Sequence, residues 1–224
     1  NFYKYPSKSI NTIGITGTNG KTTVAQITKA FLEEGLEQKC GVIGTLGFMI
    51  NNNFLKTNLT TPESLDIQKM LKTLIDNKIN NVVIEVSSHA LKQHRVYNIE
   101  FDISVFTNLT QDHLDYHKTM EDYFNAKSIL FSKLNKNSYS VINIDNTYGE
   151  KIYKKLFNNK ISYGFNDQAD ICALNSEFSL SGTAIYLKIF NDKHVIITNL
   201  IGAYNISNIL ASIGILISLG HKVD

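Results

Sequence analysis

The sequence predicts an α/β fold: a doubly wound, mostly parallel sheet with a P-loop-like phosphate site, and a small antiparallel β-sheet near the C-terminal end. Three observations predict it. Apolar runs alternate with helical periods from residue 12 onward, which is typical of strand–helix–strand units. Residues 82–86 and 103–106 have the apolar character of strands buried on both faces. After residue 170 the segments become short, alternating and separated by turn residues.

The elements follow in chain order. Residues 12–16 form a short run rich in β-branched residues, and the next segment, 20–34, carries apolar residues at helical spacing. Thr119, followed by two acidic residues, favours a helix start there. The other expected elements are strands at 40–46, 82–86, 103–106, 141–144 and 161–163, antiparallel strands at 178–180, 184–190 and 195–198, and helices at 63–76, 119–131, 148–157 and 205–219.

Composition limits the class of protein. The chain has 224 residues, enough for one sizeable core and a small appendage, and 43% of them are hydrophobic and 19% charged, which excludes a disordered, collagenous or coiled-coil chain. The net charge of +2 gives no overall electrostatic attraction to nucleic acid or an anionic membrane. Two cysteines, Cys40 and Cys172, are too few and too far apart for a disulfide framework or a paired-cysteine zinc site.

The sequence shows neither a secretory signal nor a membrane-spanning segment. No charged segment precedes an apolar one, and the longest apolar stretch, 209–219, is too short to span a bilayer. We therefore expect a cytoplasmic protein without stable membrane insertion, and we also expect a monomer. Residues 1–11 read as a lead-in from a preceding domain, and residues 12–224 as one domain with its antiparallel subsheet at about 170–199.

The glycine-rich segment 17–23, Gly-Thr-Asn-Gly-Lys-Thr-Thr, follows the first strand and opens the first helix. Its glycines allow backbone N–H groups to face an anion, Lys21 can reach the β- and γ-phosphates, and Thr22 can ligate Mg²⁺. The usual P-loop spacing calls for glycine at the position of Ile15, so this is a shortened variant. The alternative is an ordinary strand–turn–helix with chance glycines.

Glu85 stands near the carboxyl end of an otherwise apolar strand. Burying an unpaired carboxylate costs on the order of several kcal/mol in folding free energy, so such a group needs a cation or hydrogen-bond donors nearby. Ligands of α/β sheets lie beyond the carboxyl ends of the strands, where the phosphate loop also lies. Glu85 is therefore a candidate Mg²⁺ ligand; the alternative is a terminal glutamate that reaches solvent.

The next strand, 103–106, also ends in a polar cluster, residues 107–117. His113 and His117 are four residues apart, as in some zinc sites, but no cysteine or Glu-x-x-His pattern supports zinc. Taken alone, a loop histidine is more often a hydrogen-bonded surface residue. Three polar loops expected at one edge of the sheet favour a nucleotide phosphate with a metal ion.

These motifs together resemble the Mur ligases. The matching segments are 17–23, Leu-Thr-Thr-Pro at 59–62, Glu-Val-Ser-Ser-His-Ala-Leu at 85–91, and 108–115. The runs 87–95, 106–109 and 112–117 resemble more narrowly the central domain of the tripeptide-synthetase (MurE) type. The resemblance spans nearly the whole chain, in order and spacing.

The resemblance implies an ATP-dependent amide ligase of peptidoglycan synthesis. Its acceptor would be UDP-N-acetylmuramoyl-L-alanyl-D-glutamate, which receives a diamino acid, diaminopimelate or lysine, through an acyl phosphate. The C-terminal domain that reads this amino acid in the family, and the N-terminal domain that grips the uridine, are not in these 224 residues. We therefore expect the chain alone to bind ATP weakly without turnover.

The resemblance also assigns roles residue by residue. ATP would be held by Gly17, Thr18, Asn19, Gly20, Lys21, Thr22 and Thr23, with Asn205 and Asn208 near the adenine. Thr22 and Glu85 would hold one Mg²⁺, and His113 and Lys127 a second. The acceptor would be held by Thr60, Thr61, Ser87, Gln93 and Arg95. Lys21, Glu85, His113 and Lys127 would be the catalytic residues.

Lys127 is the position that matches a carbamylated lysine in the family. Addition of CO₂ to its amine would turn a cation into a carboxylate-like group that supports the second Mg²⁺. From the residues alone, Lys127 is an ordinary lysine on a helix surface, and only the resemblance favours the modification.

Two positions differ from the Mur ligase pattern, and two other functions remain as alternatives. Leu59 stands where many relatives have asparagine, which puts one acceptor contact in doubt, and Lys118 replaces a common glycine. One alternative is a related ligase such as folylpolyglutamate synthase, which the segments 59–62 and 87–95 disfavour. The other is a non-catalytic nucleotide-binding module or a switch GTPase, although no Asn-Lys-x-Asp string occurs.

Overall fold

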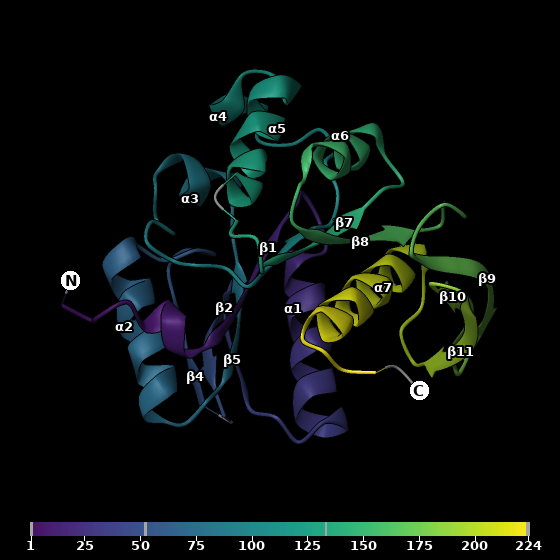
Figure 1. Cartoon of the computed structure of the whole chain (residues 1–224), viewed down its shortest axis with the longest axis horizontal. Helices are drawn as coiled ribbons and strands as arrows, with labels where there is room; N and C mark the ends of the chain where they lie inside the picture. Colours follow the sequence, from purple (N-terminus) through teal and green to yellow (C-terminus); the bar gives the residue numbers. More distant parts are fainter. Residues whose placement is uncertain (1, 52, 133, 223–224) are drawn as a thin grey trace.

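A single eleven-stranded sheet with helices on both faces forms the molecule (Figure 1). The computed structural model describes residues 2–51, 53–132 and 134–222, so the outer limits of the expected domain ranges, residues 1 and 224, lie outside it. The strand order is β11-β10-β9-β8-β7-β6-β1-β5-β2-β3-β4. The central pairs are parallel and the pairs at both edges are antiparallel, which confirms the predicted α/β class.

The strands and helices of the described residues have the following bounds. The strands are β1 (Asn11–Thr16), β2 (Cys40–Gly44), β3 (Gly47–Ile50), β4 (Asn53–Leu55), β5 (Asn81–Glu85), β6 (Ile103–Phe106), β7 (Tyr139–Asn143), β8 (Asn159–Gly164), β9 (Ile171–Ser179), β10 (Gly182–Ile189) and β11 (Asp192–Thr198). The helices are α1 (Lys21–Ala30), α2 (Ser64–Asp76), α3 (Ser88–Lys92), α4 (Leu114–His117), α5 (Met120–Ser128), α6 (Thr147–Lys155) and α7 (Ala203–Ser218). Short 3₁₀ or wide turns occupy Pro6–Ser9, Phe31–Gly35 and Ile129–Phe131.

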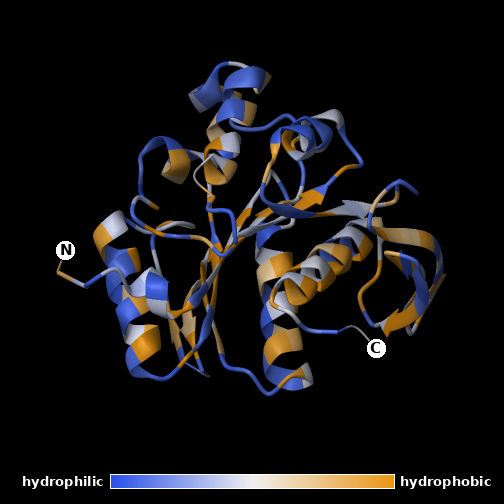
Figure 2. Cartoon of the chain, viewed as in Figure 1, coloured by the Kyte–Doolittle hydropathy of each residue, from blue (hydrophilic) through white to orange (hydrophobic). Residues whose placement is uncertain are grey.

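Two apolar cores lie on the two faces of the sheet. One packs α1 and α7 against the sheet, and α7 is apolar along most of its length (Figure 2). The other packs α2, α3, α5 and α6 against the opposite face. Successive strand residues alternate between the cores: Val83 belongs to the first, and Val82 and Ile84 to the second. This two-sided burial explains why the central strands read as continuous apolar runs.

The edges of the sheet differ from the sequence prediction in detail. Residues 40–46 were expected to form one strand, but β2 ends at Gly44 and the chain turns back into β3, a hairpin made possible by Gly47 at φ 123°. The antiparallel strands β9–β11 are present as predicted, but they continue the main sheet, because β8 pairs in parallel with β9 through Tyr163↔Ile171 and Gly164↔Cys172. β9 begins at Ile171, well before the expected residue 178.

The short helices α3 and α4 were not predicted, since four or five residues are too few for a helical period. Both lie in the segments that follow the carboxyl ends of β5 and β6 (Figure 1). Because β1, β5 and β6 are parallel neighbours, the loops that follow them meet at one edge of the sheet. The described helices include none long and apolar enough to cross a membrane.

Candidate active site

The loop between β1 and α1 has the backbone of an anion site. Gly20, the residue before α1, has φ 88°, and no side chain caps the first turn of the helix. The N–H groups of that turn therefore remain available to an anion, and the helix dipole adds partial positive charge there. A Cβ at Gly17 would lie 1.8 Å from Thr107 Oγ1, so only glycine fits this position.

The loop after β6 holds the phosphate loop in place. Thr107 Oγ1 donates to the Asn19 carbonyl at 2.6 Å, and Asn108 exchanges hydrogen bonds with Asn19 on both sides, its Oδ1 accepting from Asn19 N at 2.9 Å. Thr18 N donates to the Asn108 carbonyl at 2.9 Å. These side chains therefore shape the phosphate loop from outside it. Sequence reasoning did not single them out as site residues.

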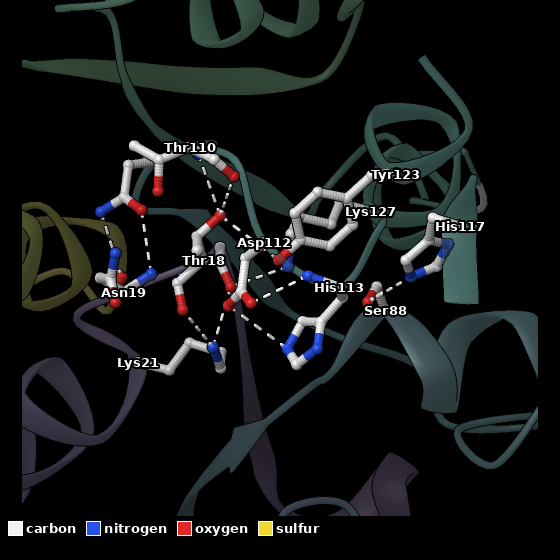
Figure 3. Close-up of polar contacts among 12 residues, drawn as sticks. Thr18, Asn19, Lys21, Ser88, Thr110, Asp112, His113, His117, Tyr123 and Lys127 are labelled. Atoms are coloured by element: carbon white, nitrogen blue, oxygen red, sulfur yellow. Dashed lines mark hydrogen bonds and ion pairs between the residues drawn. The ribbon is translucent and has the colours of Figure 1, made fainter. Parts of the chain in front are cut away.

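Lys21 folds back over this loop. Its Nζ donates to the carbonyls of Gly17 at 2.8 Å and Thr18 at 2.9 Å (Figure 3). Burial lowers the pKa of Lys21, and the negative charges of Glu85 and Asp112 oppose this effect. The amine therefore lies beside the anion site, where the two carboxylates partly offset the effect of burial on its charge.

Glu85 is fully enclosed, with 1% of its surface exposed. Its strand position, two residues after Val83, turns it toward α1, where Thr22 Oγ1 donates to Oε2 at 2.8 Å. Thr45 adds its backbone N–H to Oε1 at 3.0 Å and its hydroxyl to Oε2 at 2.9 Å. Within the described residues no lysine or arginine forms an ion pair with this carboxylate. A buried carboxylate next to a threonine hydroxyl is an oxygen donor set that fits Mg²⁺.

Lys127 is buried, with 1% of its surface exposed, although a surface position was the ordinary expectation for such a lysine. Its Nζ donates to the Gly17 carbonyl at 2.7 Å and lies 4.4 Å from the ring centre of Tyr123. Burial, and then the positive charge of Lys21, lower the pKa of Lys127 to about 6. The amine is therefore mostly neutral at pH 7, and a neutral amine is a nucleophile.

His113 and Asp112 are partly exposed residues of the loop after β6. His113 is about half exposed, has φ 51°, and its Nε2 lies 3.5 Å from Asp112 Oδ2. The rings of His113 and Tyr123 are nearly perpendicular, with centroids 6.0 Å apart. Among the described residues there is no group of three or more His, Cys, Asp and Glu side chains arranged to hold a metal ion.

The expected acceptor residues form a second group next to Glu85. Thr61 Oγ1 donates to the Glu85 carbonyl at 2.8 Å and accepts from Ser87 N at 3.0 Å. Arg95 donates to the Thr61 carbonyl at 3.0 Å, and its second terminal nitrogen to Gln93 Oε1. Thr60 joins the same group through Thr45, at 3.1 Å between hydroxyl oxygens.

The remaining expected residues lie around the loop. A Cβ at Gly20 would lie 2.5 Å from Asn208 Oδ1, which brings the start of α7 against the phosphate loop. Asn205 is one turn earlier, where its amide donates to the Ile201 carbonyl at 3.0 Å. Thr23 is half-buried in the first turn of α1. Leu59 is 40% exposed beside the acceptor group.

Sequence reasoning missed Tyr123, which joins several of these parts. Its hydroxyl lies 3.3 Å from Thr18 Oγ1, Lys127 Nζ lies over its ring, and the ring also stacks on His117 with centroids 4.9 Å apart. The spacing of four residues between Tyr123 and Lys127 on one helix was the available signal, because such residues lie on the same helix face.

His117 is buried without charge, and this predicts an acid-labile fold. Burial lowers the pKa of His117 to about 4 from an ordinary 6.5, so the unfolded chain takes up a proton between these values that the folded chain does not. His117 leaves the free energy of unfolding unchanged above about pH 6.5 and lowers it by at most about 3 kcal/mol as the pH falls to 4 and below. We expect Tm to fall over this interval, and less so in a variant with His117→Phe and Ser88→Ala.

The measurement is Tm against pH for the two proteins side by side. Burial also lowers the pKa of His89, which remains in the variant, so a residual slope is expected. Equal slopes in the two proteins would contradict the assignment of acid lability to His117.

Comparison with known proteins gives consistent matches. The family model described as "Mur ligase middle domain" matches residues 15–216. A UDP-N-acetylmuramoyl-L-alanyl-D-glutamate–2,6-diaminopimelate ligase of Clostridium botulinum is 49% identical over 214 residues, covering 96% of this chain and 44% of the relative. The ligase of the same name from Aquifex aeolicus is 41% identical over 100% of this chain and 45% of its own length.

Solved structures agree on the fold. A UDP-N-acetylmuramoyl-L-alanyl-D-glutamate–2,6-diaminopimelate ligase superposes with a TM-score of 0.86 at 30% identity, covering 95% of this chain and 44% of that one. A folylpolyglutamate synthase of Mycobacterium tuberculosis complexed with ADP and AMPPCP has a TM-score of 0.77 at 16% identity over 98% of this chain and 57% of its own, which shows a shared fold only. The chain spans a little under half the length of the curated relatives it matches.

Proposed function

Because the chain belongs to the Mur ligase family, we propose that it is the ATP-binding middle domain of a longer ligase of peptidoglycan precursor synthesis. That ligase joins 2,6-diaminopimelate to UDP-N-acetylmuramoyl-L-alanyl-D-glutamate at the expense of ATP. The observation that carries the proposal is the group around the phosphate loop: Lys21 and Lys127 both bonded to the Gly17 carbonyl, with Glu85 buried beside Thr22. The names of the relatives supply the acceptor and the amino acid.

The loop and Lys21 serve the first chemical step. In that step a carboxylate oxygen of the acceptor bonds to the γ-phosphorus of ATP, the bond from that phosphorus to the β–γ bridging oxygen breaks, and ADP leaves. Charge on the transferring phosphoryl group is stabilised by Lys21 and by the N–H groups of the first turn of α1. The carboxylates near Lys21 keep its ammonium form available for this task.

The second step makes the amide bond. The amine of the incoming amino acid attacks the carbonyl carbon of the acyl phosphate, the carbon–oxygen bond to phosphate breaks, and a proton leaves the nitrogen. Phosphate and the tripeptide product are released. On this proposal the amino acid is read by a part of the ligase outside these 224 residues, and the chain alone binds nucleotide without turnover.

We further propose two Mg²⁺ sites beside the phosphate loop. Thr22 and Glu85 offer oxygens for one, and His113 with a carbamate on Lys127 offers donors for a second. When bound, such ions neutralise phosphate charge and orient the γ-phosphoryl group. Glu85 already accepts hydrogen bonds from both threonine neighbours, which fixes the direction of its oxygens.

Lys127 is prepared for carbamylation by its surroundings. Its neutral amine can attack the carbon of CO₂, forming the N–C bond as one C–O π bond opens and one proton leaves to solvent. The pKa of about 6 makes this possible near neutral pH, whereas an exposed lysine is protonated there. The product is an anion placed next to the cation Lys21.

The acceptor residues match the acidic substrate. Arg95 is held in place by the Thr61 carbonyl and an ion pair to Glu63 at 3.2 Å, and a guanidinium binds carboxylate or phosphate oxygens in pairs. Ser87 and Thr61 hold the chain at the end of β5, between Arg95 and Glu85. We therefore propose that the D-glutamate end of the acceptor lies between these groups and the phosphate loop. We also propose that the enzyme acts in the cytoplasm, where nucleotide substrates of this kind are made, and that it acts as a monomer.

The test is amino-acid-dependent release of phosphate from ATP by the full-length ligase that contains these residues. With the acceptor present, we expect 2,6-diaminopimelate to stimulate release and lysine to do so at least about tenfold less, as expected when a site built for a polar group meets an analogue lacking it. The control omits the acceptor. Equal stimulation by lysine would refute the choice of diaminopimelate, and stimulation by a folate in place of the acceptor would refute the family branch.

A further inference from the structure

His117 has no role in the proposed chemistry, yet it lies between the acceptor residues and the residues around the phosphate loop. The residue is the last of α4, 1% exposed, and its Nε2 lies 2.8 Å from Ser88 Oγ at the start of α3. Helix α3 leads to the acceptor residues Gln93 and Arg95. Helix α4 begins after His113, and α5, which follows it (Figure 1), carries Lys127.

A second contact ties the same ring to the nucleotide side. The imidazole of His117 stacks on Tyr123, with centroids 4.9 Å apart and planes at 29°. Tyr123 in turn lies over Lys127 Nζ and bonds to Thr18 of the phosphate loop. One side chain therefore contacts both the acceptor helix and the packing that surrounds Lys127.

The polar ring is a poor choice for stability alone. Its Nδ1 is buried and, within the part of the chain that the structure describes, has no hydrogen-bond partner. A buried polar atom without a partner costs stability, whereas replacing both members of a buried polar pair by apolar groups of similar shape is close to neutral. Residues that weaken the fold in this way are expected where function requires them.

We propose that His117 is a positioning residue for the ligase reaction: it fixes α3 against α4 and α5, so that the acceptor carboxylate meets the γ-phosphate of ATP. The inference rests on the proposed function. Its physical reason is that a misplacement of about 1 Å between reacting groups costs on the order of a hundredfold in rate. The hydrogen bond to Ser88 sets the approach of α3, and the stacking on Tyr123 sets the orientation of the ring.

The experiment uses the full-length ligase with His117→Phe and Ser88→Ala together, which removes both partners of the hydrogen bond while retaining an aromatic ring on Tyr123. We expect Tm to be equal to or above that of the wild type, kcat/KM for the acceptor to fall about 10- to 100-fold, and KM for ATP to change less than about threefold. His117→Gln, whose amide can still reach Ser88 Oγ, is expected to recover part of the lost kcat/KM. His194→Phe in β11, remote from the site, is the matched control and is expected to behave as the wild type.

Three results would contradict the positioning role of His117 or the proposed function. Wild-type kinetics in the double variant would overturn the positioning role of His117. A drop in Tm that accompanies the loss of activity, without recovery in His117→Gln, would overturn it in favour of a structural role. Absence of acceptor-dependent phosphate release in the wild type itself would overturn the proposed function, and the inference with it.

Discussion

Replacement of Lys127 by alanine in the full-length ligase is expected to lower kcat for amide formation by about two to three orders of magnitude, the range seen when one preorganised stabilising group is removed. The reason is the position of this lysine. Its amine is buried against the phosphate loop, neutral at pH 7, and next to Lys21. As a carbamate it would place an anion beside the phosphate loop.

The carbamate itself can be observed. Wild-type protein in ¹³C-bicarbonate is expected to show a carbamate carbonyl signal that Lys127→Ala lacks, and activity of the wild type is expected to rise with added bicarbonate after CO₂ has been removed. Lys118→Ala, on the exposed surface beyond α4, is the matched control and is expected to retain both properties. Full activity in Lys127→Ala, without a response to bicarbonate, would refute the carbamate assignment.

The pH dependence of this signal follows from the pKa of Lys127. CO₂ reacts with the neutral amine only, so the carbamate is expected to form readily above about pH 6 and to be lost below it, where the amine is protonated. An exposed lysine would require a far more alkaline solution for the same reaction.

Replacement of Glu85 by glutamine is the second large effect. We expect kcat to fall by about two to three orders of magnitude and the Mg²⁺ requirement to shift to higher concentrations, because the buried carboxylate is the charged oxygen donor beside Thr22. Tm is expected not to fall, because glutamine has the same shape and removes a buried charge without an opposite charge bonded to it. The threonine hydroxyls that donate to Glu85 can rotate to accept from the new amide.

The measurements are phosphate release against Mg²⁺ concentration and thermal unfolding. Glu150→Gln is the matched control: that residue lies on the exposed side of α6, in an i,i+4 pair with Lys154 that contributes little to stability. Restoration of wild-type kcat at high Mg²⁺ would agree with a metal-binding role for Glu85. A loss of Tm in step with the loss of activity would contradict it.

The central fold was predictable because its signals are local. The runs 82–86 and 103–106 matched β5 and β6 closely, since strands buried on both faces must be apolar at every position. The glycine-rich loop was predictable for the same reason, because Gly17 and Gly20 occupy backbone positions that other residues do not tolerate.

The edge elements and the site geometry were not predictable in the same way. The hairpin of β2 and β3 interrupts an apolar run with a turn at Thr45 and Leu46, neither of which is a residue typical of turns. The burial of Lys127 depends on the contact of α5 with the loop after β1, residues more than a hundred positions apart in sequence. Only the completed packing shows that this lysine is enclosed, and only the family resemblance had pointed to it.

One carbonyl oxygen, that of Gly17, accepts hydrogen bonds from the amines of both Lys21 and Lys127. Lys21 also donates to the Thr18 carbonyl, so an anion that draws its amine away from the loop exchanges for bonds that the protein already makes. The gain on nucleotide binding is then the difference between two sets of hydrogen bonds, smaller than the new contacts alone would provide. The binding free energy of ADP is reduced for the same reason, because the Gly17 carbonyl accepts the Lys21 hydrogen bond again when ADP leaves. We therefore expect the Gly17 carbonyl to favour rapid exchange of ADP for ATP over tight binding of either nucleotide.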